Sequence, residues 1–214
     1  MTYIIMCGGE YTEWEKPRQL VEIKGEPIIA RTIRLLKEQG VEDIAISSNN
    51  PVFKNFGVPV LHHENNFVTN GHGYDGCYWF DCFYPTSEPV CYVFGDVIFS
   101  RNAIEKIVST EATDYEFFAS APPFSPEFHK ESAEPYALKV IDQEGFRESL
   151  KLCRVLTDRN LFKRKPIMWE VWQVLKGTPL NIIDYTNYTV INDFTCDIDH
   201  PDEVRLYENF IGDR

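Results

Sequence analysis

The chain has 214 residues and 43% hydrophobic side chains, enough to form one sizeable buried core. Its formal net charge of −12 argues against nucleic-acid binding, because phosphate backbones are bound mainly through clustered lysine and arginine. Residues 1–40 contain six basic and six acidic side chains, so the acidic excess lies entirely after residue 40. We therefore expect an anionic ligand to bind in this N-terminal region.

Other features of the composition concern the cellular compartment. The N-terminus has no basic segment followed by a long apolar run, and no apolar run reaches membrane-spanning length. The six cysteines form no CxxC pair, so we expect reduced core thiols, with structural zinc as the weaker alternative. These features predict a cytoplasmic protein that binds neither nucleic acid nor membranes.

Strand-like and helix-like segments alternate along the first half, which predicts a mostly parallel sheet covered by helices. We expect strands at residues 3–7, 43–48, 58–62, 90–99 and 115–121. We expect helices at residues 28–39, 74–83 and 103–109. Gly95 and Asp96 interrupt the long strand 90–99, and Ser100 or Asn102 can cap the next helix.

A proline-rich run at residues 122–126 marks the transition to the second half of the chain. Beyond it we expect strands at residues 136–141 and 181–185, and a helix at 167–175 that ends at Gly177. A last helix is expected to begin near Pro201, which suits a first turn, and to end at about Phe210.

The first predicted strand runs directly into Cys7, Gly8 and Gly9, and the basic residues Lys16 and Arg18 follow. Glycines after a strand let backbone N–H groups approach a phosphate, and nearby basic side chains can neutralise it. Neither the GxGxxG nor the GxxxxGK[ST] spacing is present. Taken alone, this segment is only a weak indication of a phosphate-binding loop.

Three motifs in order give this loop its context. They are Cys-Gly-Gly at 7–9 with Pro-Arg-Gln-Leu at 17–20 and Gly-Glu-Pro-Ile at 25–28, Val-Phe-Gly-Asp at 93–96, and Asp-Ile-Asp-His-Pro-Asp-Glu at 197–203. This series resembles the nucleotidyltransferase superfamily, a group of GT-A-like NTP transferases, over nearly the whole chain. It is most similar to CTP-dependent branches such as the phosphocholine, phosphoglutamine and methylerythritol-phosphate cytidylyltransferases.

The resemblance implies an α/β fold, a Rossmann-like three-layer sandwich with a mostly parallel central sheet. It also implies a single nucleotidyltransferase domain over residues 1–214, with a nucleotide-binding half at 1–121 and an acceptor-binding half at 122–214. The sequence departs from the family in two places. The further loop glycine and arginine have no counterpart in residues 10–15, and Arg18 stands where the family has a lysine.

The chemistry implied by the family is in-line attack of an acceptor phosphate oxygen on the α-phosphorus of an NTP, which expels pyrophosphate. Both reactants are anionic, so catalysis depends mainly on positioning and charge neutralisation. The resemblance implies Mg²⁺ bound by Asp96 and Asp199, with Asp197 as the alternative ligand. Either Arg18 or Lys16 would take the role of the family's lysine.

Acceptor and base recognition are also implied by the resemblance. Lys139 resembles the basic residue that holds the acceptor phosphate, and an exposed strand lysine is the alternative. Nucleotide contacts are expected from Cys7, Gly8, Gly9, Gln19, Ser48, Asn49, Asn70 and Gly71. Asn70 could read a pyrimidine edge or could simply cap the helix predicted at 74–83.

These residues together predict a cytidylyltransferase that transfers CMP from CTP to a small phosphorylated acceptor in cell-surface or capsular polysaccharide biosynthesis. CTP is preferred because residues 17–20 are most similar to the opening of the cytidylyltransferase branches. The alternatives are a sugar-1-phosphate nucleotidyltransferase that uses UTP or dTTP, a nucleotide-binding regulator without turnover, and a glycosyltransferase. A homodimer is left open.

Overall fold

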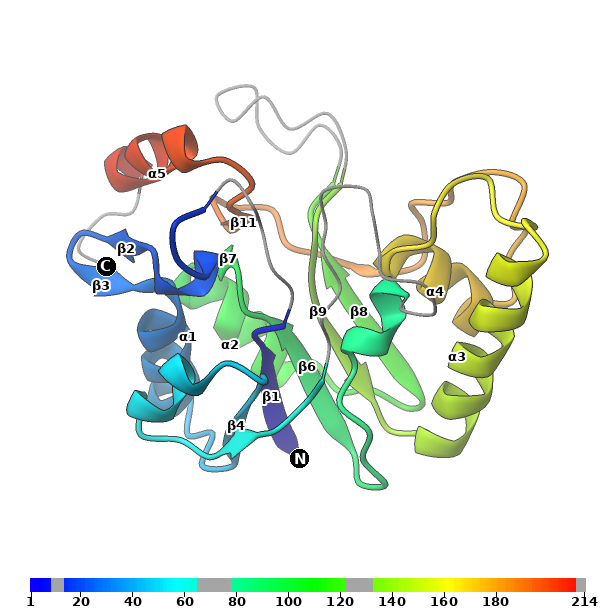
Figure 1. Cartoon of the computed structure of the whole chain (residues 1–214), viewed down its shortest axis with the longest axis horizontal. Coiled ribbons are helices and arrows are strands. Elements are labelled where there is room, and N and C mark those ends of the chain that lie inside the picture. Colours follow the sequence, from blue (N-terminus) through cyan, green and yellow to red (C-terminus); the bar gives the residue numbers. More distant parts are fainter. Residues whose placement is uncertain (9–13, 65–77, 122–132, 211–214) are drawn as a thin grey trace.

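The computed structural model describes residues 1–8, 14–64, 78–121 and 133–210. A seven-stranded sheet forms the centre of the molecule, in the order β10-β8-β9-β6-β1-β4-β5 (Figure 1). Its strands are β1 Thr2–Met6, β4 Ile44–Ser47, β5 Val60–Leu61, β6 Val90–Phe94, β8 Tyr115–Ala119, β9 Pro135–Val140 and β10 Thr189–Val190. Only β9 runs antiparallel to its neighbours, so the predicted mostly parallel sheet is confirmed.

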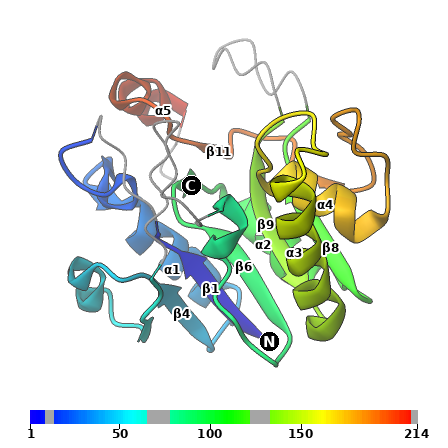
Figure 2. The same ribbon diagram turned by 45° about the vertical axis from the view of Figure 1, so that its right-hand side comes forward.

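Helices cover both faces of this sheet, which confirms the three-layer sandwich (Figures 1 and 2). One face carries α1 Ile28–Glu38 and α2 Arg101–Ser109, and the other carries α3 Gln143–Asp158 and α4 Met168–Lys176. The strands β1 and β6 at the centre consist almost entirely of buried apolar residues, as expected for strands covered on both faces. On α1, Ile29, Ile33 and Leu36 form the buried stripe that the sequence predicted.

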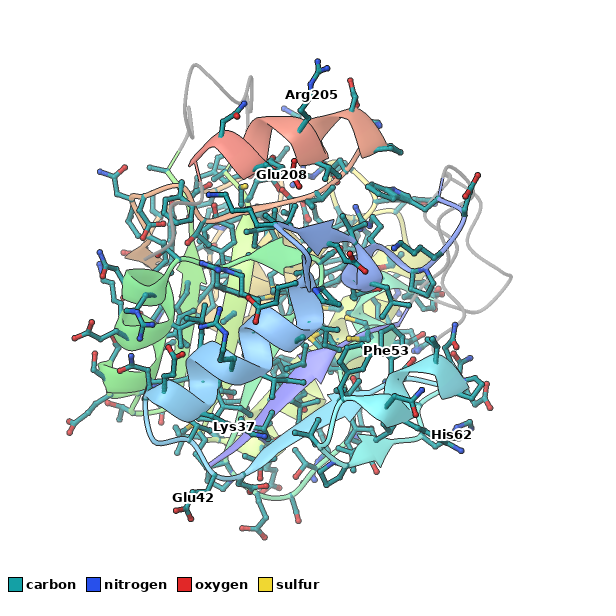
Figure 3. The ribbon with its side chains drawn as sticks, turned by 90° about the vertical axis from the view of Figure 1, so that its left-hand side faces the viewer. Lys37, Glu42, Phe53, His62, Arg205 and Glu208 are labelled. Atoms are coloured by element: carbon teal, nitrogen blue, oxygen red, sulfur yellow. The ribbon has the colours of Figure 1, made fainter. Side chains whose placement is uncertain are left out.

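A second, smaller core joins the beginning of the chain to its end. It contains the hairpin of β2 Glu22–Ile23 and β3 Glu26–Pro27, the strand pair β7 Val97–Ile98 and β11 Cys196–Asp197, and α5 Val204–Phe210. Its buried side chains are Val21, Ile23, Ile28, Ile98, Cys196, Ile198 and Tyr207. Figure 3 shows α5 lying across this end, with Glu208 toward the hairpin, where it accepts a hydrogen bond from the Lys24 backbone.

Several local predictions are confirmed. Ser100 caps α2 by accepting a hydrogen bond from Ala103 N, and α4 ends at Gly177, which adopts the left-handed conformation with a φ of 64°. Pro201 lies in the first turn of a short 3-10 helix, Pro201–Glu203, that leads into α5. The five described cysteines, Cys7, Cys82, Cys91, Cys153 and Cys196, are all free thiols.

Other predictions are wrong. Of the helix predicted at 74–83, the described part is only a 3-10 turn, Trp79–Cys82, and residues 74–77 lie outside the described part. Residues 181–185 form no strand; Ile182 is exposed, and Thr189–Val190 pairs with β8 instead. The predicted transition at 122–126 lies outside the described residues.

The helix α3, which at 16 residues is the longest helix described, was not predicted from the sequence. Its buried apolar stripe is narrow, with Phe146 and Cys153 at its centre, while Leu152 and Val155 are exposed. Gly145 in the first turn further weakened the helical pattern, because glycine is a poor helix former. A glycine is nevertheless needed there, since the Cβ of any other residue would lie 2.2 Å from the carboxylate of Asp142, which caps the helix.

Candidate active site

The candidate site lies at the edge of the sheet where the parallel strands β1, β4 and β6 end, here called the carboxyl edge. Hydrogen bonds join the first residues beyond these strands. Cys7 N donates to Ser47 O at 3.0 Å, Ser48 Oγ donates to Cys7 O at 2.8 Å, and Gly95 N donates to Met6 O at 3.1 Å. The three strand ends are therefore fixed relative to one another, as a binding site at this edge of an α/β sheet requires.

Gly95 is needed because the chain segments approach each other closely there. A Cβ at this position would lie 2.4 Å from Met6 O, 2.8 Å from Cys7 Sγ and 3.1 Å from Gln19 Cγ. Gln19 is itself buried against this turn. The Gly-Asp motif thus lets residues 17–20 pack directly on the end of β6, which places Asp96 next to Arg18.

Arg18 is the centre of a charge cluster formed by three distant segments. Its Nη2 donates to an Asp96 carboxylate oxygen, and its Nη1 donates to Asp199 Oδ1 at 3.1 Å and to Ile198 O at 2.5 Å. The Arg18 side chain is only 5% exposed, against 18% for Asp96 and 44% for Asp199. The guanidinium therefore lies deeper than the two carboxylates that it joins.

The segment that carries Asp199 is held in place by its backbone. β11 pairs with β7, and Ile198 N donates to Asp96 O at 3.2 Å. Trp14 Nε1 donates to Asp199 O at 3.2 Å, and the Glu203 carboxylate accepts from Asp199 N at 2.8 Å. The end of the chain is thereby placed against the end of β6.

Asp197, the alternative ligand, lies in β11, where it pairs with Val97 and its carbonyl accepts a hydrogen bond from Tyr207. The geometry favours Asp199 over Asp197, because Asp199 and Asp96 converge on one guanidinium. Mg²⁺ in nucleotide sites is commonly held by one or two carboxylates together with substrate phosphates. Two converging carboxylates fit that donor set, although no group of three metal-ligating side chains occurs among the described residues.

Lys16 differs from Arg18 in its surroundings. It is exposed two residues before Arg18, and it makes no ion pair or hydrogen bond with any described residue. Its side chain is therefore open to solvent, two residues along the chain from the charge cluster.

The predicted position of Lys139 is wrong. β9 runs antiparallel to β6, and Lys139 pairs with Cys91 near the start of β6, at the end opposite Asp96. Its Nζ donates to the carbonyls of Val108 and Thr110 at the end of α2, and burial lowers its pKa. Lys139 therefore satisfies the last carbonyls of a helix and lies away from the candidate site.

Ser48 and Asn49 lie at the carboxyl edge as expected, but the Ser48 hydroxyl is engaged with the backbone. It donates to Cys7 O and accepts from Asn50 N at 3.1 Å.

Burial, together with the nearby Asp96 carboxylate, raises the pKa of the Cys7 thiol well above its usual value, so Cys7 stays protonated. Gly8 is half-buried beside it; Gly9, Asn70 and Gly71 lie outside the described residues.

Two residues that were not predicted from the sequence, Trp14 and Glu203, hydrogen-bond to the backbone of Asp199 and so position it. Glu203 had a recognisable signal, because it stands three residues after His200, the spacing of a capping box, and its carboxylate accepts from His200 N. Trp14 had none, since its partner lies 185 residues away.

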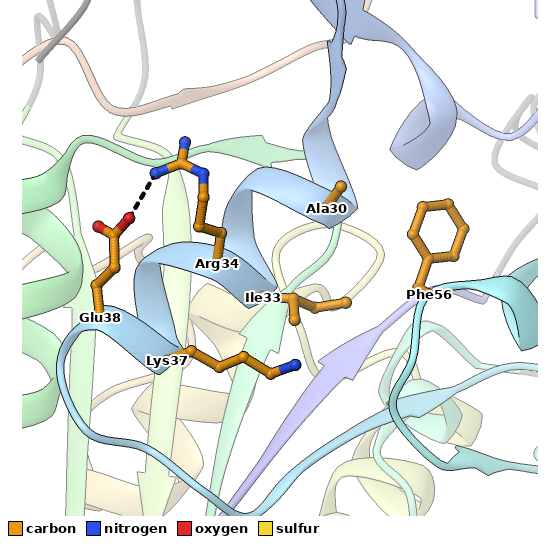
Figure 4. Close-up of a pocket in the computed structure, with 6 residues that line it drawn as sticks. All are labelled: Ala30, Ile33, Arg34, Lys37, Glu38 and Phe56. Carbon is orange, nitrogen blue, oxygen red and sulfur yellow. Dashed lines mark hydrogen bonds and ion pairs between the residues drawn. The ribbon is translucent and has the colours of Figure 1, made fainter.

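A pocket of about 390 Å³ lies elsewhere, on the outer side of α1 (Figure 4). Within the described chain it is lined by Ala30, Ile33, Arg34, Lys37, Glu38 and Phe56. None of the predicted site residues lines it, so it does not coincide with the cluster around Arg18.

A family comparison decides the class of the protein. Residues 3–148 match the model of the MobA-like NTP transferase domain. The chain belongs to this family. The MobA-like assignment makes it a nucleotidyltransferase, an enzyme that transfers a nucleoside monophosphate from an NTP to a phosphorylated acceptor.

Solved structures agree with the fold of this MobA-like transferase. A Bacillus anthracis protein assigned as a glucose-1-phosphate thymidylyltransferase, in complex with a sucrose, is similar with a TM-score of 0.57 and 13% identity over 99% of this chain and 96% of that one. The 2-C-methyl-D-erythritol 4-phosphate cytidylyltransferase of Thermus thermophilus has a TM-score of 0.55 and 13% identity over 97% of each chain. HddC from Yersinia pseudotuberculosis, complexed with GMP-PN, has a TM-score of 0.52 and 15% identity over 97% of this chain and 98% of that one.

At such identities these likenesses concern the fold of the MobA-like transferase alone. No curated protein matches its sequence. Within the described residues, no helix is both long and apolar enough to cross a membrane.

Proposed function

We propose that the protein is a cytidylyltransferase, which transfers CMP from CTP to a small phosphorylated acceptor and releases pyrophosphate. The observation that carries the proposal is the convergence of Asp96, Asp199 and Arg18 at the carboxyl edge, where nucleotides bind in α/β sheets. The choice of CTP depends on residues 17–20, Pro-Arg-Gln-Leu, which are similar to the cytidylyltransferase opening. A biosynthetic role in cell-surface or capsular polysaccharides follows from the same resemblance.

In this proposal Asp96 and Asp199 would hold Mg²⁺, which when bound supplies positive charge against the α-phosphate and the leaving pyrophosphate. The chain's own residues bind and orient the substrates. Cys7 is bonded through its backbone to Ser47 and Ser48 at the end of β4, and Gly8, which follows it, would allow close approach of the nucleotide. Either Lys16 or Arg18 would balance the charge of the two anionic reactants.

Pyrophosphate release tests the activity directly. The full chain is incubated with Mg²⁺, each of CTP, UTP, dTTP, ATP and GTP, and a panel of acceptors that includes phosphocholine, a phosphoamino acid and sugar 1-phosphates. We expect acceptor-dependent release with CTP at a rate at least about tenfold above that with any other NTP. Preference for another NTP would refute the assignment to CTP, although not the family.

A second candidate is a sugar-1-phosphate nucleotidyltransferase that uses UTP or dTTP. It is favoured by the likeness, over nearly the full length, to the Bacillus anthracis protein assigned to thymidylyl transfer. Release with dTTP or UTP and a sugar 1-phosphate, in the same assay, would select this candidate.

A nucleotide-binding regulator is the alternative of another class, and the missing loop glycine and arginine in residues 10–15 favour it. It predicts binding of an NTP without pyrophosphate release under any condition in the panel.

A further inference from the structure

Arg18 stands where the family has a lysine. Its side chain is buried against carboxylates and a carbonyl, whereas a side chain that binds a phosphate must be accessible to it. Three of its partners belong to the protein's own candidate metal-binding elements: the carboxylates of Asp96 and Asp199 and the carbonyl of Ile198. Its side chain is only 5% exposed. A guanidinium with two terminal nitrogens can bind two carboxylates at once, which a single ammonium group does with much less geometric control.

Relative depth indicates the side from which a ligand can approach. Asp199 is 44% exposed and Asp96 18%, so both carboxylates are more open to solvent than the guanidinium. In these two ion pairs Arg18 contacts Oδ2 of Asp96 and Oδ1 of Asp199. A cation approaching from solvent therefore meets the carboxylates first, with Arg18 behind them.

Lys16 has the complementary properties. It is exposed, it lies two residues from Arg18 on the same segment, and it contacts no described residue through an ion pair or hydrogen bond. Pro17 lies between the two basic residues, in an extended conformation with φ −50° and ψ 133°, and Arg18 then begins a short 3-10 helix, Arg18–Leu20. The change of backbone conformation lets one basic side chain enter the interior while the other stays at the surface.

We propose that the family's single lysine role is divided in this chain: Arg18 is a positioning residue that orients the Asp96 and Asp199 carboxylates, and Lys16 is the residue that contacts the nucleotide phosphates. This inference rests on the proposed function, because it assigns the carboxylates to a divalent cation. It concerns how charge is arranged in the site, whichever NTP and acceptor are used.

Two binding measurements separate the roles without turnover. Mn²⁺ binding to the metal-free protein is followed by electron paramagnetic resonance, and binding of inorganic tripolyphosphate is followed by calorimetry in EDTA. Arg18→Lys keeps the charge and removes the two-pronged geometry, so Mn²⁺ affinity should fall at least about tenfold while tripolyphosphate affinity stays within about twofold. Lys16→Met should show the reverse, with tripolyphosphate affinity lowered about tenfold and Mn²⁺ affinity unchanged.

Arg34→Lys is the matched control, because Arg34 also joins two carboxylates, Glu26 and Glu38, but on the outer face of α1. It should change neither affinity. If Arg18→Lys instead weakened tripolyphosphate binding and left Mn²⁺ binding intact, Arg18 would be the phosphate ligand and the proposal would be overturned.

Arg18 is buried, so its variant could fail to fold, and circular dichroism checks this. Lys16 is exposed, and Lys16→Met therefore keeps the proposal open to refutation: unchanged tripolyphosphate affinity would overturn it. Pyrophosphate release by the unaltered protein separates this inference from the proposed function. Absence of release with the predicted binding pattern would refute only the function, whereas release with the reversed pattern would refute only the division of roles.

Discussion

Two arginines in this chain are each held by two carboxylates, and they differ in burial and in the length of chain that they connect. Arg34 is 42% exposed, and its partners Glu26 and Glu38 lie eight and four residues away. Arg18 is 5% exposed, and its partners Asp96 and Asp199 lie 78 and 181 residues away. The first cluster is local in sequence, with Glu26 in β3 and Glu38 one helical turn from Arg34 on α1, whereas the second exists only in the folded chain.

The difference shows which charge cluster is a functional candidate. Taking charges out of water is costly even when they are paired, so a buried arginine with two carboxylates is weak evidence of stabilisation by itself. The Arg18 cluster is instead a functional candidate because it fixes three segments of the chain at the carboxyl edge, where an NTP would bind. Exposed pairs such as Arg34–Glu38 contribute little and are common on helices.

The largest expected effect comes from Asp96→Asn, which keeps the shape of the side chain and removes its charge. Turnover should fall by about 10³-fold, because the charge that would hold the cation opposite the α-phosphate is lost. Pyrophosphate release measures it, and the unfolding transition shows that the fold is retained. Asp43→Asn, at the opposite end of the sheet where Asp43 accepts a hydrogen bond from Thr2 Oγ1, should leave turnover unchanged.

Arg18→Lys sharpens the comparison by keeping the charge of the buried cluster. We expect turnover to fall about 10- to 100-fold, as for outer partners of metal ligands, while Arg34→Lys keeps the wild-type rate. Steady-state kinetics at saturating Mg²⁺ measure both. Equal rates for the two variants would mean that charge alone, and not the guanidinium geometry, matters at position 18.

Gly95→Ala tests whether the close approach at the end of β6 positions the buried cluster. A Cβ would lie 2.4 Å from the backbone oxygen of Met6, which cannot move without disturbing β1, so the free energy of unfolding should fall by about 1–3 kcal/mol. Denaturant unfolding measures the loss. Wild-type stability would show that the chain segments do not approach Gly95 this closely.

The smallest effect is expected for Arg34→Gln, at about 0.5 kcal/mol of unfolding free energy, because the Arg34 pairs are partly exposed. Hydrogen bonding to Arg34 lowers the pKa of Glu26 and of Glu38 below their ordinary value of 4.5. A carboxyl group whose pKa is lower in the folded than in the unfolded state stabilises the folded state at any pH above its unfolded-state pKa. This stabilisation is lost as the pH falls through the folded-state pKa.

The wild-type protein should therefore lose its advantage over Arg34→Gln as the pH falls below 4.5. Unfolding curves between pH 7 and pH 3 measure this difference, at low ionic strength to limit screening. An advantage at pH 3 as large as that at pH 7 would contradict the assigned pairs.

The fold could be predicted largely from local signals. Apolar runs specified β1 and β6, helical spacing specified α1, and Ser100 and Gly177 specified helix ends. Local signals failed where tertiary contacts outweigh the pattern. The segment 181–185 looks like a strand, yet the edge position beside β8 is taken by β10.

For the candidate site, the sequence by itself determined the residue types and the strand ends that bring them to one edge. Gly95 and Asp96 after a buried strand, and Gly8 after another, follow from the parallel order of β1 and β6. Only the tertiary structure decided the direction of each strand, the burial of each basic side chain and the residues that it contacts. Lys139 moves to the far end because β9 is antiparallel, and Arg18 turns inward while Lys16 stays exposed. These outcomes depend on contacts between residues far apart in the chain, which no local pattern encodes.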